Sequence, residues 1–301
     1  MHRDDRVLPA ILSSAGGIRN NSPIAPGILT AEAIQASFRP LPRSRHSLLQ
    51  SVTQDELYDS GNWMAPGGLL LANLVAEQLE LRPGERVLDL GCGRGQSSVF
   101  LASQFGVEVV SLDLWENIQG RKRRASEASV ESLVTPLRGD ISRGLPLEFR
   151  DFDAIFCLQA FHCFGTKLSM LRYLASLLKA DGRICFAQGC FKEEPGPLPS
   201  LFTDTDGWHV EYGNYHSPAW WRDHLQSSEQ FDVQVAQEVL DGDVFWEDDV
   251  LYRGHRAGWS EDFLNRSNWL IRQIAHGQKH KPSLTHCILH AAKRDRKGIS
   301  I

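Results

Sequence analysis

The chain has 301 residues, of which 42% are hydrophobic and 23% are charged, and its formal net charge is only -5. This composition is typical of a globular protein with a sizeable core, and it disfavours nucleic-acid binding, because such proteins present many Lys and Arg side chains to phosphates. The sequence has no run approaching the roughly 18–20 apolar residues that span a bilayer, so we expect no stable membrane insertion.

The beginning of the chain differs from the rest. Residues 1–50 show no sustained periodicity and are interrupted by several prolines, which predicts a poorly ordered arm with a short helix near Leu29 to Phe38. Asp4 and Asp5 disfavour a secretory signal, whereas the Ser- and Arg-rich composition leaves an organellar transit segment open. The six cysteines form no CxxC pair, which favours reduced thiols and a cytoplasmic location.

After residue 50, apolar residues from Met64 to Leu81 recur at helical spacing, and Pro83 then ends that helix. Short apolar runs next alternate with helical patterns. We expect strands at 86–90, 107–112, 134–138, 152–158 and 182–188, and helices at 96–105, 116–133 and 167–179. Such alternation predicts a parallel sheet with helices on both faces.

The last third of the chain carries two insertions around two further expected strands. The strands are at 231–239 and 284–291, which brings the sheet to seven strands. The insertions, residues 191–230 and 241–283, hold six of the eight tryptophans and predict an aromatic cap on a domain that covers residues 51–301. We expect two charged runs, Arg121 to Arg124 and Glu247 to Asp249, to lie on the surface.

The strongest motif follows the first expected strand, in the segment Val87 to Gln96. An apolar run ends in Asp89, and a glycine-rich turn opens the next helix. Glycine is needed where the backbone takes a positive φ or approaches a ligand closely. The pattern is GxGxG, with Gln96 where a GxGxxG dinucleotide loop would have its last glycine, so it departs from NAD or FAD binding.

This motif resembles motif I of the class I S-adenosylmethionine (SAM)-dependent methyltransferases. The resemblance implies a Rossmann-like fold, with Asp89 near the methionine end of SAM and the glycine backbone under the ligand. Asp113 matches the acid that accepts hydrogen bonds from both ribose hydroxyls, and Asp140 with Ile141 matches the adenine contact. The residues that the resemblance assigns to SAM are Asp89, Gly91, Gly93, Gly95, Gln96, Asp113, Leu114, Asp140, Ile141 and Gln159.

Four further segments resemble a group of microbial methyltransferase-domain proteins: Met64 to Gly68, Asp113 to Trp115, Phe161 to Gly165 and Ser217 to Arg222. Members of that group often carry an acidic residue where this chain has Gln159. In this family, the segment before the first helix often folds as a lid over SAM. The resemblance therefore makes Tyr58 and Trp63, which precede the first helix of the domain, candidates for that lid.

Methyl transfer from a sulfonium has a neutral leaving group, so alignment supplies much of the rate, and a base is needed only when the acceptor must lose a proton. His162 lies just past the fourth expected strand and is our first candidate for a base or a substrate-orienting group. Tyr215 and His216 are further candidates, because the fold usually places its substrate cap in the first insertion. No metal ligand set is evident.

The sequence therefore predicts a SAM-dependent methyltransferase with a small-molecule substrate. Two alternatives stay open: a SAM-binding protein without methyl transfer, such as a cyclase, a regulatory subunit or a degenerate paralogue, and a lipid-modifying enzyme of the cyclopropane-synthase type. A nucleic-acid methyltransferase is disfavoured, since Leu158 to Phe161 lacks the Pro-Pro-aromatic segment that holds a flipped base. The acceptor atom and the oligomeric state are not predicted.

Overall fold

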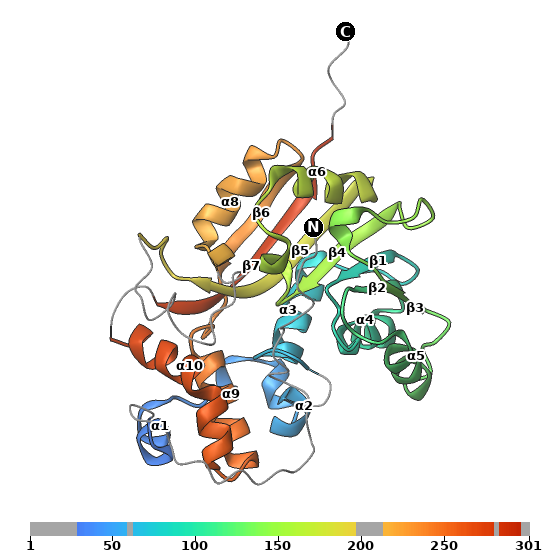
Figure 1. Cartoon of the computed structure of the whole chain (residues 1–301). Coiled ribbons are helices and arrows are strands. Elements are labelled where there is room, and N and C mark those ends of the chain that lie inside the picture. The colour runs from blue at the N-terminus through green and yellow to red at the C-terminus, as the bar shows by residue number, and fades with distance from the viewer. Residues whose placement is uncertain (1–28, 59–62, 197–212, 280–282, 296–301) are drawn as a thin grey trace, which may run out of the picture.

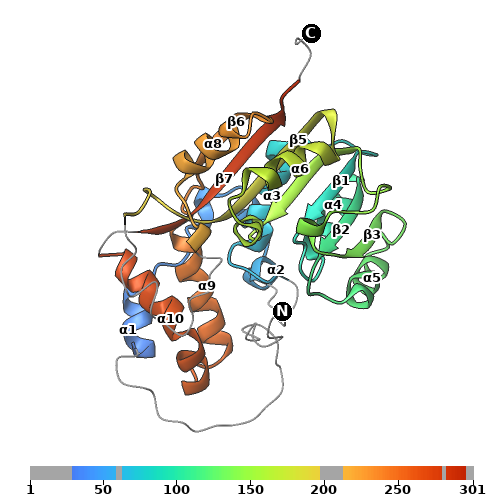
Figure 2. The ribbon, with the colours of Figure 1, turned by 45° about the horizontal axis from the view of Figure 1, so that its top comes forward.

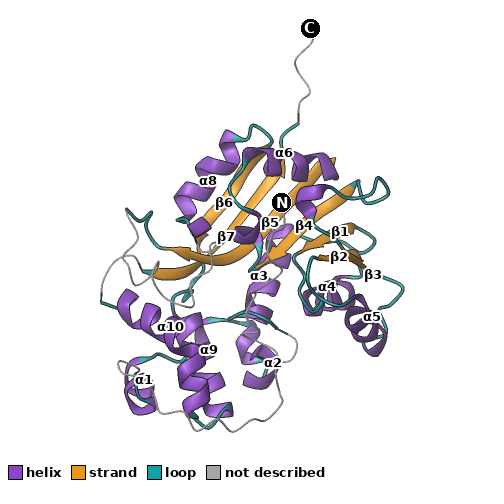
Figure 3. Ribbon diagram, in the orientation of Figure 1, coloured by secondary structure: helices purple, strands orange, loops and turns teal. Residues whose placement is uncertain are grey.

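The computed structural model describes residues 29–58, 63–196, 213–279 and 283–295, which form a seven-stranded sheet with helices on both faces (Figures 1 and 3). The strand order is β3-β2-β1-β4-β5-β7-β6. The strands β1 to β5 are parallel to one another, and β7 is antiparallel to both β5 and β6. The predicted Rossmann-like, mostly parallel sheet is confirmed.

The strands lie close to their predicted positions. They are β1 (Arg86–Leu90), β2 (Glu108–Asp113), β3 (Val134–Arg138), β4 (Phe152–Leu158), β5 (Leu178–Phe191), β6 (Phe231–Glu238) and β7 (Leu284–Lys293). The helices are α1 (Ala31–Ser37), α2 (Gln54–Tyr58), α3 (Gly68–Leu79), α4 (Gln96–Phe105), α5 (Ile118–Glu127), α6 (Leu168–Leu177), α8 (Pro218–Ser227), α9 (Val244–Arg256) and α10 (Glu261–Gly277). Within the described ranges, no helix combines the length and apolarity needed to cross a membrane.

The sheet is buried on both faces, which explains why its central strands are nearly continuous apolar runs. On one face, helices α3, α4 and α5 form a core with the strands, in which Val75 packs near Val87 and Phe156. On the other face, α6 and α8 form a second core around Trp221 and Phe186. The chain proceeds outward from β1 through β2 to β3 and then returns to β4, so a crevice opens at the carboxyl ends of β1 and β4.

The structure differs from the poorly ordered arm expected for residues 1–50. Residues 1–28 lie outside the described structure, but residues 29–50 are folded and include α1, at the position where a short helix was expected. Ile34 and Phe38 are buried in a third core with Ile271 of α10. In both views of Figures 1 and 2, α1 lies beside α9 and α10. These apolar contacts come from residues more than 200 positions away, so no local sequence pattern could predict them.

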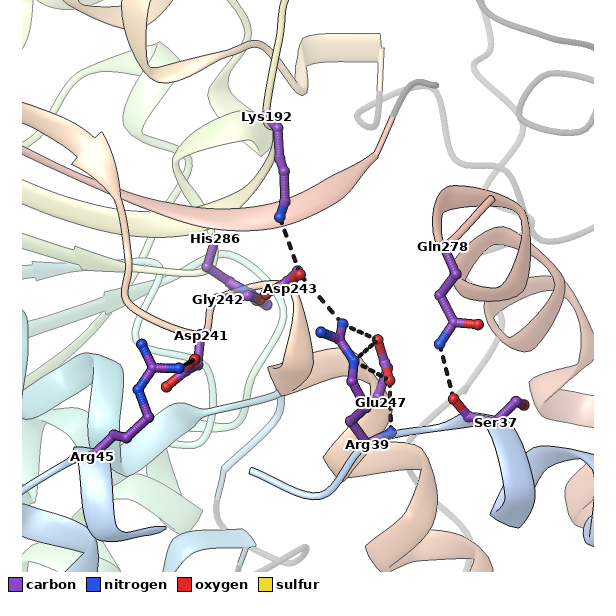
Figure 4. A network of polar contacts seen from close by, with 10 residues as sticks. All are labelled: Ser37, Arg39, Arg45, Lys192, Asp241, Gly242, Asp243, Glu247, Gln278 and His286. Carbon is purple, nitrogen blue, oxygen red and sulfur yellow. Dashed lines mark hydrogen bonds and ion pairs between the residues drawn. The ribbon is translucent and has the colours of Figure 1, made fainter. Parts of the chain in front are cut away.

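The acidic run Glu247 to Asp249, expected on the surface, is buried instead. The three side chains are between 1% and 5% exposed. Glu247 accepts hydrogen bonds from the Arg39 backbone N–H at 2.7 Å and from the Arg39 guanidinium (Figure 4). Asp248 accepts from the backbone N–H of Leu41 at 2.9 Å and from the hydroxyl of Tyr58. The acids of α9 therefore hold the segment that leads from α1 to α2.

Replacing Arg39 with methionine is expected to lower the free energy of unfolding by about 2–3 kcal/mol, because the nearly inaccessible Glu247 carboxylate then loses its charged partner. The effect stays below that of a fully buried pair, since half of the Arg39 side chain faces water. Urea unfolding checks this value. The double variant Arg39→Met/Glu247→Gln should recover part of the loss. Equal stability of Arg39→Met and the wild type would contradict this role.

Candidate functional site

The glycine turn between β1 and α4 brings bare backbone against two other segments. Gly91 and Gly93 have φ values of +75° and +53°, which favour glycine. A Cβ added to Gly91 would lie 2.5 Å from the Cβ of Ala160, and one added to Gly93 would lie 2.6 Å from the sulfur of Met64. The turn therefore packs between the segment after β4 and the segment before α3 only because both positions lack a side chain.

Asp113 ends β2 beside this turn. One carboxylate oxygen accepts the backbone N–H of Gly93 at 2.9 Å, and the other accepts those of Trp115 and Glu116 at 2.8 and 3.0 Å. A carboxylate offers about four acceptor positions. The oxygen that meets Gly93 therefore keeps capacity for a ligand hydroxyl, while the other fixes the direction of the side chain.

A cavity of about 260 Å³ lies over the turn, at the carboxyl ends of β1, β2 and β4. Its walls combine glycine backbone, one carboxylate, two amides and apolar side chains. Its lining residues are Trp63, Met64, Ala65, Gly68, Gly91, Cys92, Gly93, Gln96, Ser97, Asp113, Leu158, Gln159 and Ala160. Five residues predicted from the sequence, Gly91, Gly93, Gln96, Asp113 and Gln159, therefore share one cavity.

Asp89 lies below the turn and is fully buried. One of its oxygens accepts the hydroxyls of Ser97 and Ser98, both at 2.6 Å. The other oxygen has no hydrogen-bond partner in the described part of the chain. Burial raises the pKa of Asp89 to about 6, against the two serine hydrogen bonds. Asp89 is thus a buried carboxyl group whose ionised form is disfavoured, and it bonds Ser97, which lines the cavity.

Gln159 follows β4 and connects two sides of the cavity. Its amide nitrogen donates to the carbonyl of Pro66 at 3.1 Å, and its amide oxygen accepts the backbone N–H of Gly189 at 2.9 Å. Its φ of +54° turns the chain sharply at the strand end. An ionised acid at this position could accept from Gly189 but could not donate to Pro66, so glutamine fits both partners.

Arg121 corrects the expectation that the whole basic run of α5 faces solvent, because its side chain is only 1% exposed. Its guanidinium donates to the carbonyls of Ser111 and Leu137, and it contacts the sulfur of Cys92 at 3.3 Å. It therefore ties β2 and β3 to the glycine turn. The sequence signal was only a charged residue on a helix, so this role was missed.

Four predicted cofactor residues other than Asp89 do not line the cavity. Gly95 caps the start of α4, and Leu114, in the chain segment after β2, is 37% exposed. One carboxylate oxygen of Asp140 is engaged by the N–H and hydroxyl of Ser142, which hold the pKa of Asp140 below its usual range. Ile141 is buried in the core near α6. Their assignment to SAM stays a prediction.

His162 and Tyr215, two of the three predicted catalytic residues, lie together. Their rings meet edge to face with centroids 4.8 Å apart. Burial lowers the pKa of His162 to about 4, so the imidazole is neutral near pH 7. A Cβ on Gly189 would lie 3.0 Å from the Tyr215 hydroxyl oxygen, which places this hydroxyl beside the backbone that Gln159 binds.

His216, the third candidate, is held elsewhere. Its Nδ1 lies 2.7 Å from a carboxylate oxygen of Glu194, and its ring stacks on Trp220 at 3.6 Å. Trp221 is fully buried in the core beneath α8. These aromatic residues stabilise the start of α8, and they are absent from the cavity walls. Trp208 and the side chain of Trp269, also expected in the cap, lie outside the described structure.

The comparisons with known proteins agree with this geometry. Residues 87–182, which include β1, the glycine turn and Asp113, match the model of a methyltransferase domain. They are a class I SAM-dependent methyltransferase domain. The chain is 30% identical over 128 residues to the 27-O-demethylrifamycin SV methyltransferase of Amycolatopsis mediterranei, a match that covers 42% of this chain and 46% of that protein. The matched part of the chain spans less than half the length of each of the first curated relatives.

Two solved structures show how widely the fold of this methyltransferase domain is used. A SAM-dependent methyltransferase from Geobacter sulfurreducens in complex with S-adenosylhomocysteine has a TM-score of 0.56 at 19% identity, over 75% of this chain and 91% of that chain. The [4+2]-cyclase SpnF has a TM-score of 0.61 at 18% identity, over 85% and 97%. The shared fold therefore does not decide the reaction.

The cavity over the glycine turn offers groups that suit SAM. Asp113 retains acceptor capacity for a ribose hydroxyl, and Trp63, Met64 and Leu158 supply apolar wall. The buried oxygen of Asp89 without a partner among the described residues suits a donor or water at the methionine end. Gln96 and Ser97 add polar groups at the start of α4. The cavity chemistry thus fits the nucleoside and amino-acid parts of SAM.

Asp89→Asn is expected to stabilise the ligand-free protein at pH 7.5 but not at pH 4. A carboxyl whose folded pKa is raised to about 6 costs stability once it ionises, so its penalty grows as pH rises from about 4 through 6. The two-unit rise above an ordinary aspartate corresponds to about 2–3 kcal/mol. Urea unfolding of both proteins across this range checks it. A stability difference that does not change with pH would contradict the raised pKa.

Proposed function

We propose that this protein is a SAM-dependent methyltransferase that transfers a methyl group to a small-molecule acceptor by in-line displacement. The observation that carries the proposal is the single cavity shared by the glycine turn, Asp113 and Gln159. Asp113 and Gly93 form the side that suits the ribose, and Gln159 lies on the opposite side, toward Gly189 and Tyr215. An acceptor on that side would face the methyl group.

Bound SAM supplies an electrophilic methyl group with a neutral leaving group, so the main task of the protein is alignment. In our proposal Tyr215 touches the acceptor through its hydroxyl and orients it or accepts its proton. His162 acts as a positioning residue, because its buried neutral ring packs against Tyr215. Gln159 fixes the distance between the Pro66 segment and the end of β5. His216 has a structural role at α8.

The test is incubation with methyl-labelled SAM and panels of small amines, phenols, carboxylic acids and thiols, with S-adenosylhomocysteine release and labelled products measured together. The proposal expects stoichiometric release and product labelling with at least one class. Tight S-adenosylhomocysteine binding without any labelled product across the panels would instead favour a SAM-binding protein that does not transfer methyl groups, such as a cyclase.

Tyr215→Phe is expected to lower kcat for methyl transfer about 100-fold or more, the lower end of what a positioned proton-transfer group contributes. The Kd for S-adenosylhomocysteine should stay unchanged, since Tyr215 does not line the 260 Å³ cavity over the glycine turn, the proposed cofactor cavity. Tyr173→Phe is the matched control, because its hydroxyl accepts the backbone N–H of Leu145 and Tyr173 does not line the cavity. A loss of cofactor affinity in Tyr215→Phe, with kcat retained, would contradict the proposed role.

A further inference from the structure

A second cavity lies apart from the cofactor cavity. It has a volume of about 480 Å³ and is bounded by the segment after α1, the end of β5, the start of β7 and helices α9 and α10. None of its lining residues also lines the cofactor cavity. Its volume falls within the range of roughly 300–1,000 Å³ that is usual for small-molecule sites.

The two carboxylates of this cavity already have cationic partners. The guanidinium of Arg39 donates to both oxygens of Glu247 and to one oxygen of Asp243, the last at 3.3 Å. The ammonium of Lys192 donates to the same oxygen of Asp243 at 3.1 Å (Figure 4). Two cations and two carboxylates thus balance each other, and both cations lie on the same side of the cavity as the carboxylates that they meet.

Its donors, in contrast, have unused capacity. The side chain of Gln273 is 3% exposed, and its amide nitrogen has no hydrogen-bond partner among the described residues. The same holds for the buried indole nitrogen of Trp246. Both side chains line the cavity, on α10 and α9. An unpaired buried donor costs about 1–3 kcal/mol, so two such donors on side chains that line one cavity call for an acceptor. Lys192 has three N–H groups, of which Asp243 takes one.

We propose that this cavity binds a small molecule through an anionic oxygen group, a carboxylate or a phosphate. The group accepts hydrogen bonds from Gln273, Trp246 and Lys192, which reach the cavity from three different elements. An anion suits these three groups because all of them are donors and one of them carries a positive charge. The site is independent of the proposed methyl transfer, since the two cavities share no lining residue.

Isothermal titration with glutarate and with glycerol phosphate tests the proposal and distinguishes a carboxylate ligand from a phosphate ligand. Saturable 1:1 binding of at least one probe is expected, and the probe that binds identifies the anionic group. Gln273→Leu and Trp246→Phe should each weaken binding at least 10-fold. Arg266→Met, which removes a surface ion pair with Asp262, is the charge control and should bind as the wild type does.

Two further comparisons make the outcome decisive. Trp246→Phe keeps a ring to stack on His286, 5.0 Å away, so it should remain folded even if Gln273→Leu does not. Asp113→Ala should leave anion binding unchanged, whatever it does to cofactor binding. Failure of both probes to saturate the wild type, or unchanged affinity in Trp246→Phe with a native unfolding midpoint, would overturn the proposal.

Discussion

Gly93→Val is expected to weaken S-adenosylhomocysteine binding at least 100-fold, which corresponds to about 2.7 kcal/mol. The φ of +53° at Gly93 is a conformation that a β-branched residue rarely adopts, and it is strained by about 1–3 kcal/mol there. The new Cβ would also lie 2.6 Å from the sulfur of Met64, over the cavity. The substitution therefore both distorts the turn and fills the space above it. Calorimetric titration measures the affinity.

Gly258→Val is the matched control for backbone strain. Gly258 has a φ of +58°, close to that of Gly93, but a Cβ added there meets no atom within 4 Å. It lies after α9 and away from the cofactor cavity. This variant should lose a similar amount of stability and keep the wild-type affinity. Equal affinity losses in both variants would show that general destabilisation, and not the turn, explains the effect of Gly93→Val.

Asp113→Asn is expected to weaken S-adenosylhomocysteine binding about 10- to 100-fold, with a parallel loss of methyl transfer at low SAM. A hydrogen bond to a charged group contributes about 1.5–3 kcal/mol, and the amide gives up that charge. The amide also turns its NH2 toward either Gly93 or the Trp115 and Glu116 N–H groups, where the carboxylate had accepted. Titration calorimetry at constant ionic strength gives the affinity.

Asp223→Asn controls for the loss of one negative charge, because Asp223 lies on the surface beside Arg222. It should bind S-adenosylhomocysteine as the wild type does. If Asp113→Asn also keeps wild-type affinity, Asp113 does not accept hydrogen bonds from the ligand, and its role is limited to holding the turn.

Local patterns were sufficient to predict the sheet and the cofactor cavity. β1 and β4 are short apolar runs bounded by turn residues, and β1, β3 and β4 were predicted at their observed bounds. Glycine spacing and a strand-end acid are also local signals, and they identified Gly91, Gly93 and Asp113, which meet in one cavity. Periodicity and turn chemistry do not depend on the rest of the fold.

Features that depend on distant partners could not be predicted. Arg39 and Glu247 are 208 positions apart, and neither residue's neighbours indicate that they pair. A charged run on a helix normally faces water, so the burial of Arg121 and of the three acids of α9 required knowledge of what packs over them. The side-chain direction of His216 was also undetermined, because its stacking on Trp220 depends on how α8 begins.

Titration of S-adenosylhomocysteine into the purified wild-type protein is the most direct measurement of the central claim. We expect one exothermic site per chain with a micromolar or tighter Kd, removed by Gly93→Val and retained in Gly258→Val. A wild-type protein that is folded by circular dichroism and yet binds neither S-adenosylhomocysteine nor SAM would contradict the account.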